Sequence, residues 1–521
     1  MFGNQKNFAI IIAIIFIAIG LRIYTFSGFV GLDDAEYARF AHQIVNKTFD
    51  VKAYSGPPVF PLRIGIIFPA SVSFRLFGVS QWSMVLYPLI ISIMSILLVY
   101  YAAAYLFSIR AGLIAAALWA VLPMDINYNA TKLLPDLPAA FFASLGVVLI
   151  IFFRNSILEN KAFIFSTGLL AGILFGVSWL TKESVSYLFP FCLILMLMDL
   201  KRSLKEGIIF WVGLAVGSFA ILIIEMVVYY SMNGDLLFRF HEIERNYQQL
   251  ENGFFTEGSR FGWAKGESYY KALLKRLFLT GPETIFLNIQ FLYLPLLGIV
   301  SSLYALFWKD KRFLAPSLWL LSLFLMFNFA SSSFLSYTPL ALFERYLYPV
   351  LFPSVILTSG LIGKLFSRDE AEGVNIYREK IFWGLILTVF LLAAGGYQTF
   401  RSVRGVQSIN DWTSEVRAVS AILKPADKVY TDSISIKGLE FFWRYPIKYG
   451  AINFEGLEQT SKPEAGSFVF INQRYINWLV NNAGMWLNNG PKYSSPFFLE
   501  SISPSWKIIW QNSNATLYKV E

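Results

Sequence analysis

The chain is poor in the residues that build disulfides and metal sites. Its 521 residues include one cysteine, Cys192, and two histidines, His42 and His241. A single cysteine within an apolar run excludes a disulfide framework and a thiolate metal centre. Two histidines among scattered acids lack the ligand spacing that identifies a metal site, and we expect surface or structural positions for both. These residues identify no cofactor and leave a divalent metal open.

Charged residues are scarce as well. They make up 15% of the sequence, against about 25% in ordinary soluble domains. The hydrophobic fraction is 56% and the mean hydropathy is +0.54. The 50 Phe and 27 Tyr residues fit the aromatic belts of membrane interfaces. The composition predicts a polytopic α-helical membrane protein. Its net charge of +9 is explained by basic cytoplasmic loops, so nucleic acid is not an expected partner.

Long apolar runs occur along most of the chain. A membrane-spanning helix needs about 17–25 mainly apolar residues, and on this basis we expect about eleven spans, within a range of about 11–13. No small-residue cleavage site follows the first run, which predicts an uncleaved span rather than a signal peptide. The predicted spans cover residues 8–26, 82–107, 111–124, 136–153, 163–180, 184–198, 208–230, 284–307, 314–330, 346–362 and 381–399.

Loop charge predicts the orientation of these spans. With the N-terminus in the cytoplasm, the inside loops are short and rich in Lys and Arg, as in "DLKRSLKEG" and "WKDKRF". Basic residues are about half as dense in the outside segments, which are 27–81, 124–135, 231–283 and 331–345. We therefore expect a multi-pass protein of the cytoplasmic membrane. Its transmembrane domain would cover 1–399, with amphipathic helices in the first outer loop, and an extracytoplasmic domain would cover 400–521.

The C-terminal part of the chain has the composition of a soluble domain. The segment "DWTSEVRAVSAILKPADKVYTD" predicts an amphipathic helix, a turn at the proline and then a strand. "GSFVFINQ" predicts a second strand, and "WKIIWQNSNATLYKVE" predicts a hairpin around Asn-Ser-Asn. The sequence thus predicts a small α/β domain, in which no functional residue stands out.

The expected topology gathers ionisable residues at the outer membrane face. Charged groups at the edge of a span cost free energy unless they are paired or face a wet cavity. Because these groups come from loops that are distant in sequence, they predict one polar cleft at the membrane surface. The residues are Asp33, Asp34, Glu36, Lys132, Asp136, Lys182, Glu183, Glu344 and Arg345.

Each of these residues also has a structural interpretation. Asp33 and Glu36 fit a capping box that opens the helix "AEYARFAHQIV", whose apolar stripe would lie on the bilayer. Lys132 and Lys182 fit lysines that extend toward the membrane interface. Arg345 could pair with its neighbour Glu344, and Asp136 could be only an N-cap. The apolar stripe consists of Tyr37, Phe40, Ala41 and Ile44.

Acids and bases together at a membrane surface suit the transfer of a group carried on a lipid phosphate. Lys or Arg balances the charge of the departing phosphate through charge-assisted hydrogen bonds. A carboxylate within about 2.6–3.2 Å of the attacking hydroxyl takes its proton. A donor with a long isoprenoid tail stays in the bilayer, so its reaction site must lie at that boundary.

Five segments carry a resemblance to a known family. They are "LRIYTFSGFVGLDDAEYARFAHQIVNKTFD", "YSGPPVFPLRIG", "LLPDLPAAFF", "FGVSWLTKES" and "ERYLYPVLFP". Their order and spacing over residues 8–365 resemble GT-C-type integral-membrane glycosyltransferases. Among these, the chain is most similar to the dolichyl-phosphate-mannose protein mannosyltransferase group and the lipid A aminoarabinose transferases. The resemblance implies a GT-C-like fold with the small α/β domain added at the C-terminus.

The resemblance also implies roles for individual residues. Asp33 stands where the family's acidic pair begins and would be the catalytic base, and Asp34 stands where many relatives have Glu. Asp34 and Asp136 would belong to the catalytic group with Asp33, and Asp136, which matches the acid of the second outer loop, would orient the site or the acceptor. Lys182 and Arg345 match residues expected to meet the donor phosphate.

The chain departs from the family pattern at one position of the first outer loop. Some relatives have Lys where this chain has Gly56, and Arg63 or Lys132 would supply the missing charge. Glu36 and Tyr37 would support the site or the acceptor. Some relatives also hold a metal through a loop histidine and an acid.

The expected function is therefore inverting transfer of a sugar from a polyprenyl-phosphate donor to an acceptor hydroxyl on the extracytoplasmic face. The expected partners are the lipid-linked sugar, an acceptor protein or glycolipid, and membrane lipid. One alternative is an oligosaccharyltransferase-like ligase with a lipid-pyrophosphate donor. A second is a lipid or sugar transporter, although transporters place ionisable groups near the bilayer midplane and often show repeated halves.

Overall fold

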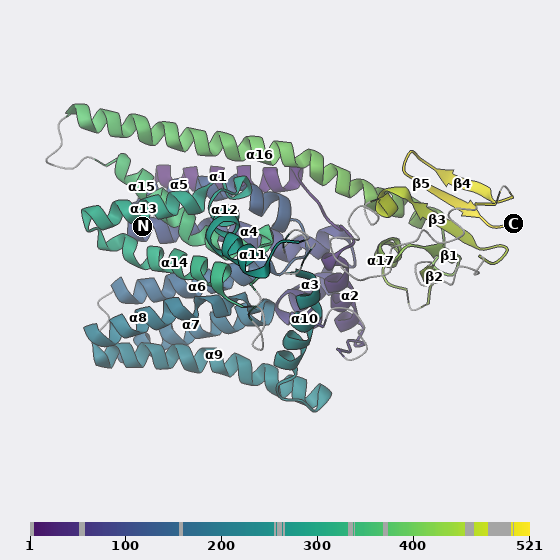
Figure 1. Cartoon of the computed structure of the whole chain (residues 1–521), viewed down its shortest axis with the longest axis horizontal. Helices are drawn as coiled ribbons and strands as arrows, with labels where there is room; N and C mark the ends of the chain where they lie inside the picture. The colour runs from purple at the N-terminus through teal and green to yellow at the C-terminus, as the bar shows by residue number, and fades with distance from the viewer. Residues whose placement is uncertain are drawn as a thin grey trace.

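The computed structural model is a long helical bundle with a small sheet domain at one end (Figure 1). It describes most of the chain. These residues are 5–51, 58–155, 160–254, 257, 263, 266–331, 337, 339–367, 374–446, 448–453, 463–477, 502–503 and 505–521.

Each of the eleven predicted spans contains a helix, but in the run 284–307 the main helix begins only at Leu294, after α12 (Gly281–Phe286) and the short 3-10 helix η4 (Ile289–Phe291). In the described part of the chain, nine helical segments are long and apolar enough to cross a membrane, and three apolar helices are shorter. Two of the shorter helices, α5 and α13, account for the two remaining predicted spans. The chain is therefore a multi-pass membrane protein. The bundle helices are α1 (Gln5–Tyr24), α4 (Gln81–Leu106), α5 (Ile109–Ala120), α6 (Asp136–Asn155), α7 (Lys161–Thr181), α8 (Phe189–Arg202), α9 (Leu204–Asn233), α13 (Leu294–Trp308), α14 (Leu314–Phe329), α15 (Leu351–Leu365) and α16 (Val374–Ile422).

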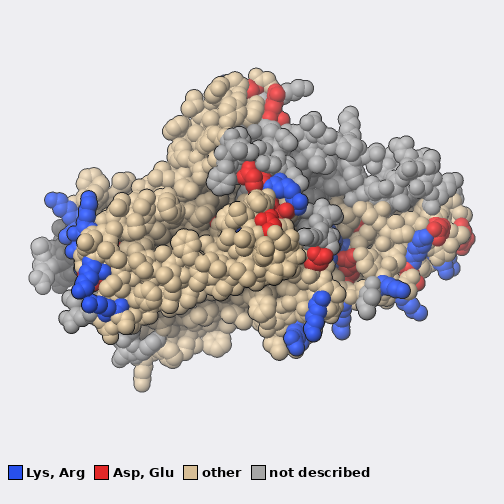
Figure 2. Space-filling view, turned by 90° about the horizontal axis from the view of Figure 1, so that it is seen from below, with Lys and Arg blue, Asp and Glu red and all other residues tan. Residues whose placement is uncertain are grey.

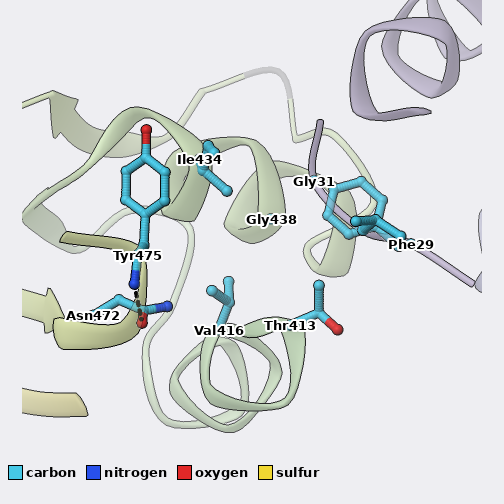
Figure 3. Close-up of a pocket in the computed structure, with 9 residues that line it drawn as sticks. Phe29, Gly31, Thr413, Val416, Ile434, Gly438, Asn472 and Tyr475 are labelled. Atoms are coloured by element: carbon cyan, nitrogen blue, oxygen red, sulfur yellow. Dashed lines mark hydrogen bonds between the residues drawn. The ribbon is translucent and has the colours of Figure 1, made fainter. Parts of the chain in front are cut away.

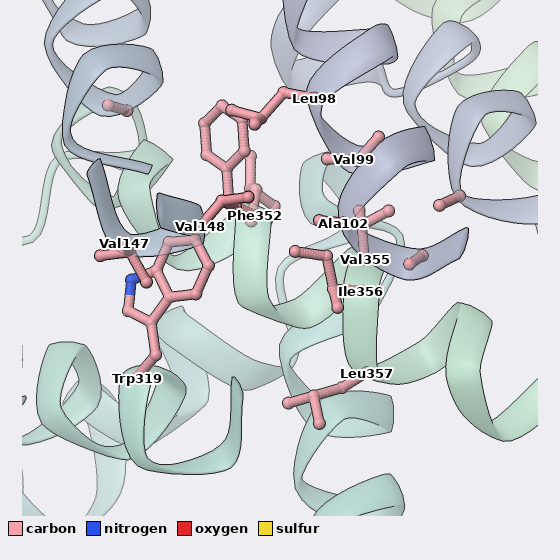
Figure 4. Packing of buried hydrophobic residues seen from close by; sticks show 14 of the residues in the cluster. Leu98, Val99, Ala102, Val147, Val148, Trp319, Phe352, Val355, Ile356 and Leu357 are labelled. Carbon is pink, nitrogen blue, oxygen red and sulfur yellow. The ribbon is translucent and has the colours of Figure 1, made fainter. Parts of the chain in front are cut away.

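Helix α15 lies at the centre of the bundle. In the span that contains it, 89% of the residues are buried, against 17% in α1. Figure 4 shows Phe352, Val355 and Ile356 of α15 among side chains of α4, α6 and α14. This packing gives α15 a fixed position, and the 3-10 helix η6 (Glu344–Val350) leads directly into it.

Helices α7 and α9 pack through glycines. A Cβ atom on Gly172 would lie 2.0 Å from the carbonyl oxygen of Leu214, and one on Gly217 would lie 2.2 Å from that of Leu169. Such small-residue faces let two backbones approach closely, which drives helix association in membranes.

Substituting Gly172 with alanine is therefore expected to lower the free energy of unfolding by about 1–3 kcal/mol, because the new methyl group forces the two helices apart. Gly396 in α16 is the matched control, since a Cβ there meets nothing within 4 Å. Thermal unfolding in detergent should show a loss for Gly172→Ala and none for Gly396→Ala. Equal stability of the two variants would contradict the close packing.

An arginine inside the first span is fully paired. Arg22 is completely buried and forms an ion pair with Asp125. Its Nε donates to Ser92 Oγ at 2.6 Å, and the hydroxyl of Tyr348 also donates to Asp125. An ionisable group within a bundle is expected to have such partners. The network joins α1, α4 and η6 to the π-helix η1 (Asp125–Asn129).

Short helices lie at the end of the bundle that faces the sheet domain, which we call the domain-side end. They include α2 (Asp33–Val45), α3 (Ile64–Phe77) and α10 (Phe238–Phe254), and the further short helices α11 (Tyr269–Lys275) and α12 (Gly281–Phe286) follow α10 in the chain. Figure 1 shows α2, α3 and α10 between the bundle and the sheet domain. The helices predicted in the first outer loop are thus confirmed as α2 and α3.

The apolar stripe of α2 has a different partner from the one predicted. Tyr37, Phe40 and Ala41 are buried in one cluster with residues of α3 and with Phe441. The stripe therefore packs against protein, and the prediction that it lies on the bilayer is wrong. It failed because the sequence pattern gives the apolar face of a helix but not the surface that covers it.

Helix α16 joins the bundle to the sheet domain. It runs without an end through residue 400 to Ile422, so the last span and the predicted amphipathic helix form one element (Figure 1). The sheet has the order β2-β1-β3-β5-β4. Its inner strand β1 is parallel to β2 and β3, β5 is antiparallel to β3, and β4 pairs with β5 as an antiparallel hairpin. The strands are β1 (Lys428–Thr431), β2 (Gly450–Asn453), β3 (Phe468–Asn472), β4 (Lys507–Gln511) and β5 (Ala515–Lys519), with α17 (Ser433–Phe442) after β1.

Charge is distributed unevenly along the bundle. Figure 2 shows Lys and Arg gathered at the end opposite the sheet domain, followed by a surface nearly free of charged residues. Acids and bases are mixed toward the domain-side end. A basic end and an uncharged belt are the distribution that the positive-inside rule describes.

Candidate active site at the domain-side end of the bundle

Asp33 and Arg345 form an ion pair at the domain-side end of the bundle. Asp33 is the first residue of α2, and Arg345 lies in η6 at the start of the central span. Arg345 Nη2 lies 2.6 Å from Asp33 Oδ2. Their side chains are 30% and 29% exposed, respectively, so a substrate can reach both. Arg345 does not pair with its neighbour Glu344, which was the alternative interpretation.

The surroundings of Asp33 keep its carboxylate ionised. Burial would raise the pKa of Asp33, but the charge and hydrogen bond of Arg345 oppose this effect. Arg63 and Lys182 lie close enough to add to the opposition, and the pKa of Asp33 falls below its usual value. Asp33 is thus an ionised carboxylate surrounded by three cations, and it can accept a proton or a hydrogen bond at neutral pH.

Lys182 and Asp136 form a second ion pair in the same cluster. Asp136 begins α6, and Lys182 directly follows the end of α7. Both side chains are buried, at 8% and 3% exposed for Lys182 and Asp136. Lys182 Nζ also lies 3.7 Å from the ring centroid of Tyr346, which is a cation–π distance. Lys182 is therefore held inside the protein and does not extend toward the membrane interface.

Arg63 joins α2 to the turn after α7. Its Nη1 donates to the hydroxyl of Tyr37 at 2.6 Å, and its Nη2 lies 3.2 Å from Glu183 Oε1. Glu183 begins the 3-10 helix η2 (Glu183–Leu188). Burial would lower the pKa of Arg63, but Tyr37 and Glu183 raise it well above its usual value. Arg63 is therefore a permanent cation beside Asp33 and Lys182.

Lys132 is the cation of this region without an acidic partner. In the described part of the chain no carboxylate lies within ion-pair distance of its Nζ, which sits 5.3 Å from the ring centroid of Tyr128. Burial lowers the pKa of Lys132 to about 8, against the attraction of Asp34. Lys132 is partly buried, and a partly buried ammonium without an ion-pair partner stabilises an incoming anion. Lys132 can therefore receive the phosphate of a substrate.

The carboxylates of Asp34 and Glu36 do not pair with the cations around Asp33 but bind other groups. Asp34 accepts hydrogen bonds from the backbone N–H groups of Val30, Gly31 and Leu32 at 2.6, 3.3 and 2.9 Å. Glu36 lies 2.8 Å from both Arg39 and Lys437. Asp34 therefore fixes the loop before α2, and Glu36 contacts the sheet domain.

The capping-box interpretation of Asp33 and Glu36 is wrong. The helix α2 has Leu32 at its N-cap, and no side chain caps the first turn. Asp34 instead turns back to bind the loop, which leaves Asp33 free to pair with Arg345. The sequence could not show which of the two adjacent carboxylates binds the loop. Asp33 and Asp34 have identical side chains, and only the backbone conformation decides the direction of each.

Two further sets of residues belong to this region. Tyr346 lies against Lys182, and Arg345 Cζ is 5.3 Å from its ring centroid. Arg239 of α10 pairs with Glu225 of α9 at 2.6 Å and lies over Trp179. The sequence signal for Glu225 is an acid inside an apolar span, which requires a partner. Tyr346 follows Arg345 directly and could have been found only from that adjacency.

The donor set of the cluster does not fit a divalent metal. Asp33, Asp136 and Glu183 are each neutralised by a cationic side chain. Among the described residues no three His, Cys, Asp or Glu side chains converge as metal ligands. His241 pairs with Asp235 at 2.8 Å on an exposed part of α10. The chemistry below therefore uses the cations of the chain itself.

Comparisons with known proteins agree with this architecture. Residues 57–230 match the family model of dolichyl-phosphate-mannose-protein mannosyltransferases. Apo ArnT from Cupriavidus metallidurans is similar over 99% of this chain and 98% of its own, with 13% identity and a TM-score of 0.56. The same enzyme bound to undecaprenyl phosphate covers 99% and 97%, with 14% identity and a TM-score of 0.55.

An archaeal protein has the same fold over a shorter length. The oligosaccharyltransferase AglB from Archaeoglobus fulgidus, in complex with an inhibitory peptide and a dolichol-phosphate, is 13% identical with a TM-score of 0.54. That match covers 87% of this chain and 64% of AglB. No curated protein sequence matches the chain. The chain has the fold of GT-C-type membrane glycosyltransferases, and the resemblance predicted from its motifs is confirmed.

Proposed function

We propose that the protein transfers a sugar from a polyprenyl-phosphate-linked donor to an acceptor hydroxyl, with inversion at the anomeric carbon. One observation carries the proposal: the ionised carboxylate of Asp33 lies 2.6 Å from Arg345, beside Arg63 and Lys182, where the helical bundle ends. The relatives support the choice of donor, since ArnT binds undecaprenyl phosphate and AglB binds a dolichol-phosphate.

The proposed reaction is a single displacement. Asp33 accepts the proton of the acceptor hydroxyl as its oxygen forms a bond to the anomeric carbon. The bond between that carbon and the donor phosphate oxygen breaks on the opposite face, and its electron pair stays on the phosphate. Arg345, Lys182 and Lys132 surround the departing phosphate and stabilise its added charge. Asp136 holds Lys182 in place.

Arg345 has two competing partners in this scheme. Without a substrate, Arg345 is bound to Asp33. This ion pair prevents Asp33 from accepting a hydrogen bond from an acceptor hydroxyl. The donor phosphate draws Arg345 toward itself through a charge-assisted hydrogen bond. Asp33 is then free to bind the acceptor, so the donor binds first.

The orientation belongs to the same proposal. The end opposite the sheet domain is rich in Lys and Arg (Figure 2), and the positive-inside rule supports a cytoplasmic position for that end. The sheet domain and the cluster around Asp33 then face the extracytoplasmic side of the cytoplasmic membrane. A polyprenyl tail can remain in the bilayer while its phosphate enters the cluster from the membrane edge.

Reconstituted vesicles test the proposed function directly. The purified protein is incubated with polyprenyl-phosphate-linked sugars and candidate acceptors, and the products are identified by mass spectrometry. A covalent product with a freed polyprenyl phosphate supports transfer. Movement of the donor across the vesicle membrane without a product would overturn the proposal in favour of transport.

Lys132 gives the donor site an expected pH dependence. The pKa of Lys132 is about 8 in the free protein, so its ammonium is charged below that pH and neutral above it. A donor phosphodiester keeps its charge over this range. The affinity for a donor analogue with a phosphodiester should therefore be constant below about pH 8 and fall as the pH rises further.

Titration of a fluorescent donor analogue from pH 6 to pH 10 measures this dependence. Lys132→Met should bind more weakly at pH 7 and lose the pH dependence, while Lys132→Arg should keep its affinity to higher pH. An identical pH profile in Lys132→Met would remove Lys132 from the donor site.

A further inference from the structure

Helix α17 of the sheet domain is in direct contact with α2, which carries Asp33. Lys437 of α17 lies 2.8 Å from Glu36 Oε1. The other carboxylate oxygen of Glu36 receives Arg39 Nη2 at 2.8 Å. Glu36 is 7% exposed, so both of its oxygens are held in a nearly buried setting, one turn of helix from Asp33.

Aromatic contacts join the two elements on either side of this ion pair. The ring of Phe441 stacks on Phe29, just before α2, with centroids 4.3 Å apart. The ring of Tyr445, just after α17, stacks on His42 near the end of α2 at 4.8 Å. The sheet domain therefore contacts α2 near both of its ends.

The loop that leads into α2 lies between the sheet domain and the carboxylate of Asp34. Its residue Gly31 has a φ of +88°, and a Cβ atom there would lie 3.2 Å from Ile434 of α17. Figure 3 shows Phe29 and Gly31 on one side of a small pocket, with Val416, Ile434 and Gly438 around it. The carboxylate of Asp34 accepts hydrogen bonds from backbone N–H groups of the same loop. The start of α2 is thus fixed from two directions.

We infer that Lys437 is a positioning residue for the transfer reaction, through which the sheet domain holds α2 so that Asp33 meets the acceptor in the reactive geometry. The inference rests on the proposed role of Asp33 as the base. Glu36 and Asp33 are three residues apart in one helix, so a change in the contact at Glu36 turns or loosens the turn that carries Asp33. A misplacement of about 1 Å can cost about 100-fold in rate.

Replacing Lys437 with methionine tests the inference. Because the aromatic contacts remain, we expect kcat to fall roughly tenfold, with the donor KM and the melting temperature unchanged. Lys437→Arg should recover most of the rate. The matched control is Lys428→Met, which removes another lysine–glutamate pair of the same domain, with Glu464, and should leave kcat unchanged. An unchanged kcat in Lys437→Met, or a parallel fall in melting temperature and donor affinity, overturns the inference.

A double variant separates this inference from the proposed function. If Lys437 acts through Asp33, adding Lys437→Met to Asp33→Asn should cause no further loss of rate. A further tenfold loss would show that Lys437 acts elsewhere. If Asp33→Asn keeps the wild-type rate, the proposed role of Asp33 fails together with the inference. If Asp33→Asn is inactive while Lys437→Met is fully active, only the inference fails.

Discussion

Replacing Asp33 with asparagine is expected to lower the kcat of sugar transfer by about 100- to 10,000-fold, the range that a general base contributes. Asparagine has nearly the same shape but cannot take the proton of the acceptor hydroxyl. The side chain is 30% exposed, so the substitution buries no new charge and the protein should remain folded. The initial rate with a polyprenyl-phosphate-linked sugar, at saturating donor, measures the effect.

Asp235→Asn is the matched control for this experiment. Asp235 is also an acid at the domain-side end, next to α10, and its partner is His241 rather than the cluster. The control should transfer sugar at the wild-type rate. A normal rate in Asp33→Asn, with normal expression and melting temperature, would remove Asp33 as the base.

The second large effect is expected at Arg345. Arg345→Gln should lower kcat/KM by about 100- to 1,000-fold, because the departing phosphate loses a preorganised cation. Arg345→Lys should restore only part of this loss, since lysine cannot offer two parallel N–H groups to a phosphate. Lys364→Gln is the matched control, as it removes a cation of the same span at its other end, where Lys364 pairs with Asp310.

Arg345→Gln is also expected to change the pH dependence of kcat/KM. In the wild type, Arg345 is the largest influence that lowers the pKa of Asp33 against the effect of burial. Without it, the pKa of Asp33 rises, so the base becomes protonated at a higher pH. The acidic limb of kcat/KM should therefore move to higher pH in Arg345→Gln. If the acidic limb of kcat/KM does not move in Arg345→Gln, the group whose titration causes that limb is not Asp33.

The hydrophobic pattern predicted the spans well because each one is a local property of the sequence. Each of the eleven apolar runs contains a helix, and the charge of the loops predicted that Asp33, Asp136, Lys182 and Arg345 lie at one end of the bundle. The strand after Pro425, the strand at Phe468–Asn472 and the C-terminal hairpin were also predicted. These elements carry strong period-two or turn signals over short stretches.

The sequence did not predict which partner each charged residue would have. Asp34 and Glu36 are adjacent to Asp33 and have the same chemistry, but one binds its own loop and the other binds Lys437. Helix α17 and strand β2 were also missed. Only ten residues form α17, with Asp432 capping Ser435 N at 2.7 Å, and β2 has only four. Short elements of this kind depend on tertiary contacts more than on local pattern.

A structure of the protein with a bound polyprenyl-phosphate donor analogue would show whether the cluster around Asp33 is the reaction site. We expect the phosphate within hydrogen-bond distance of Lys182 and Arg345, the tail in the bilayer, and Asp33 released from Arg345 and facing the anomeric carbon. A phosphate bound away from this cluster, or at the basic end of the bundle, would contradict the proposed site.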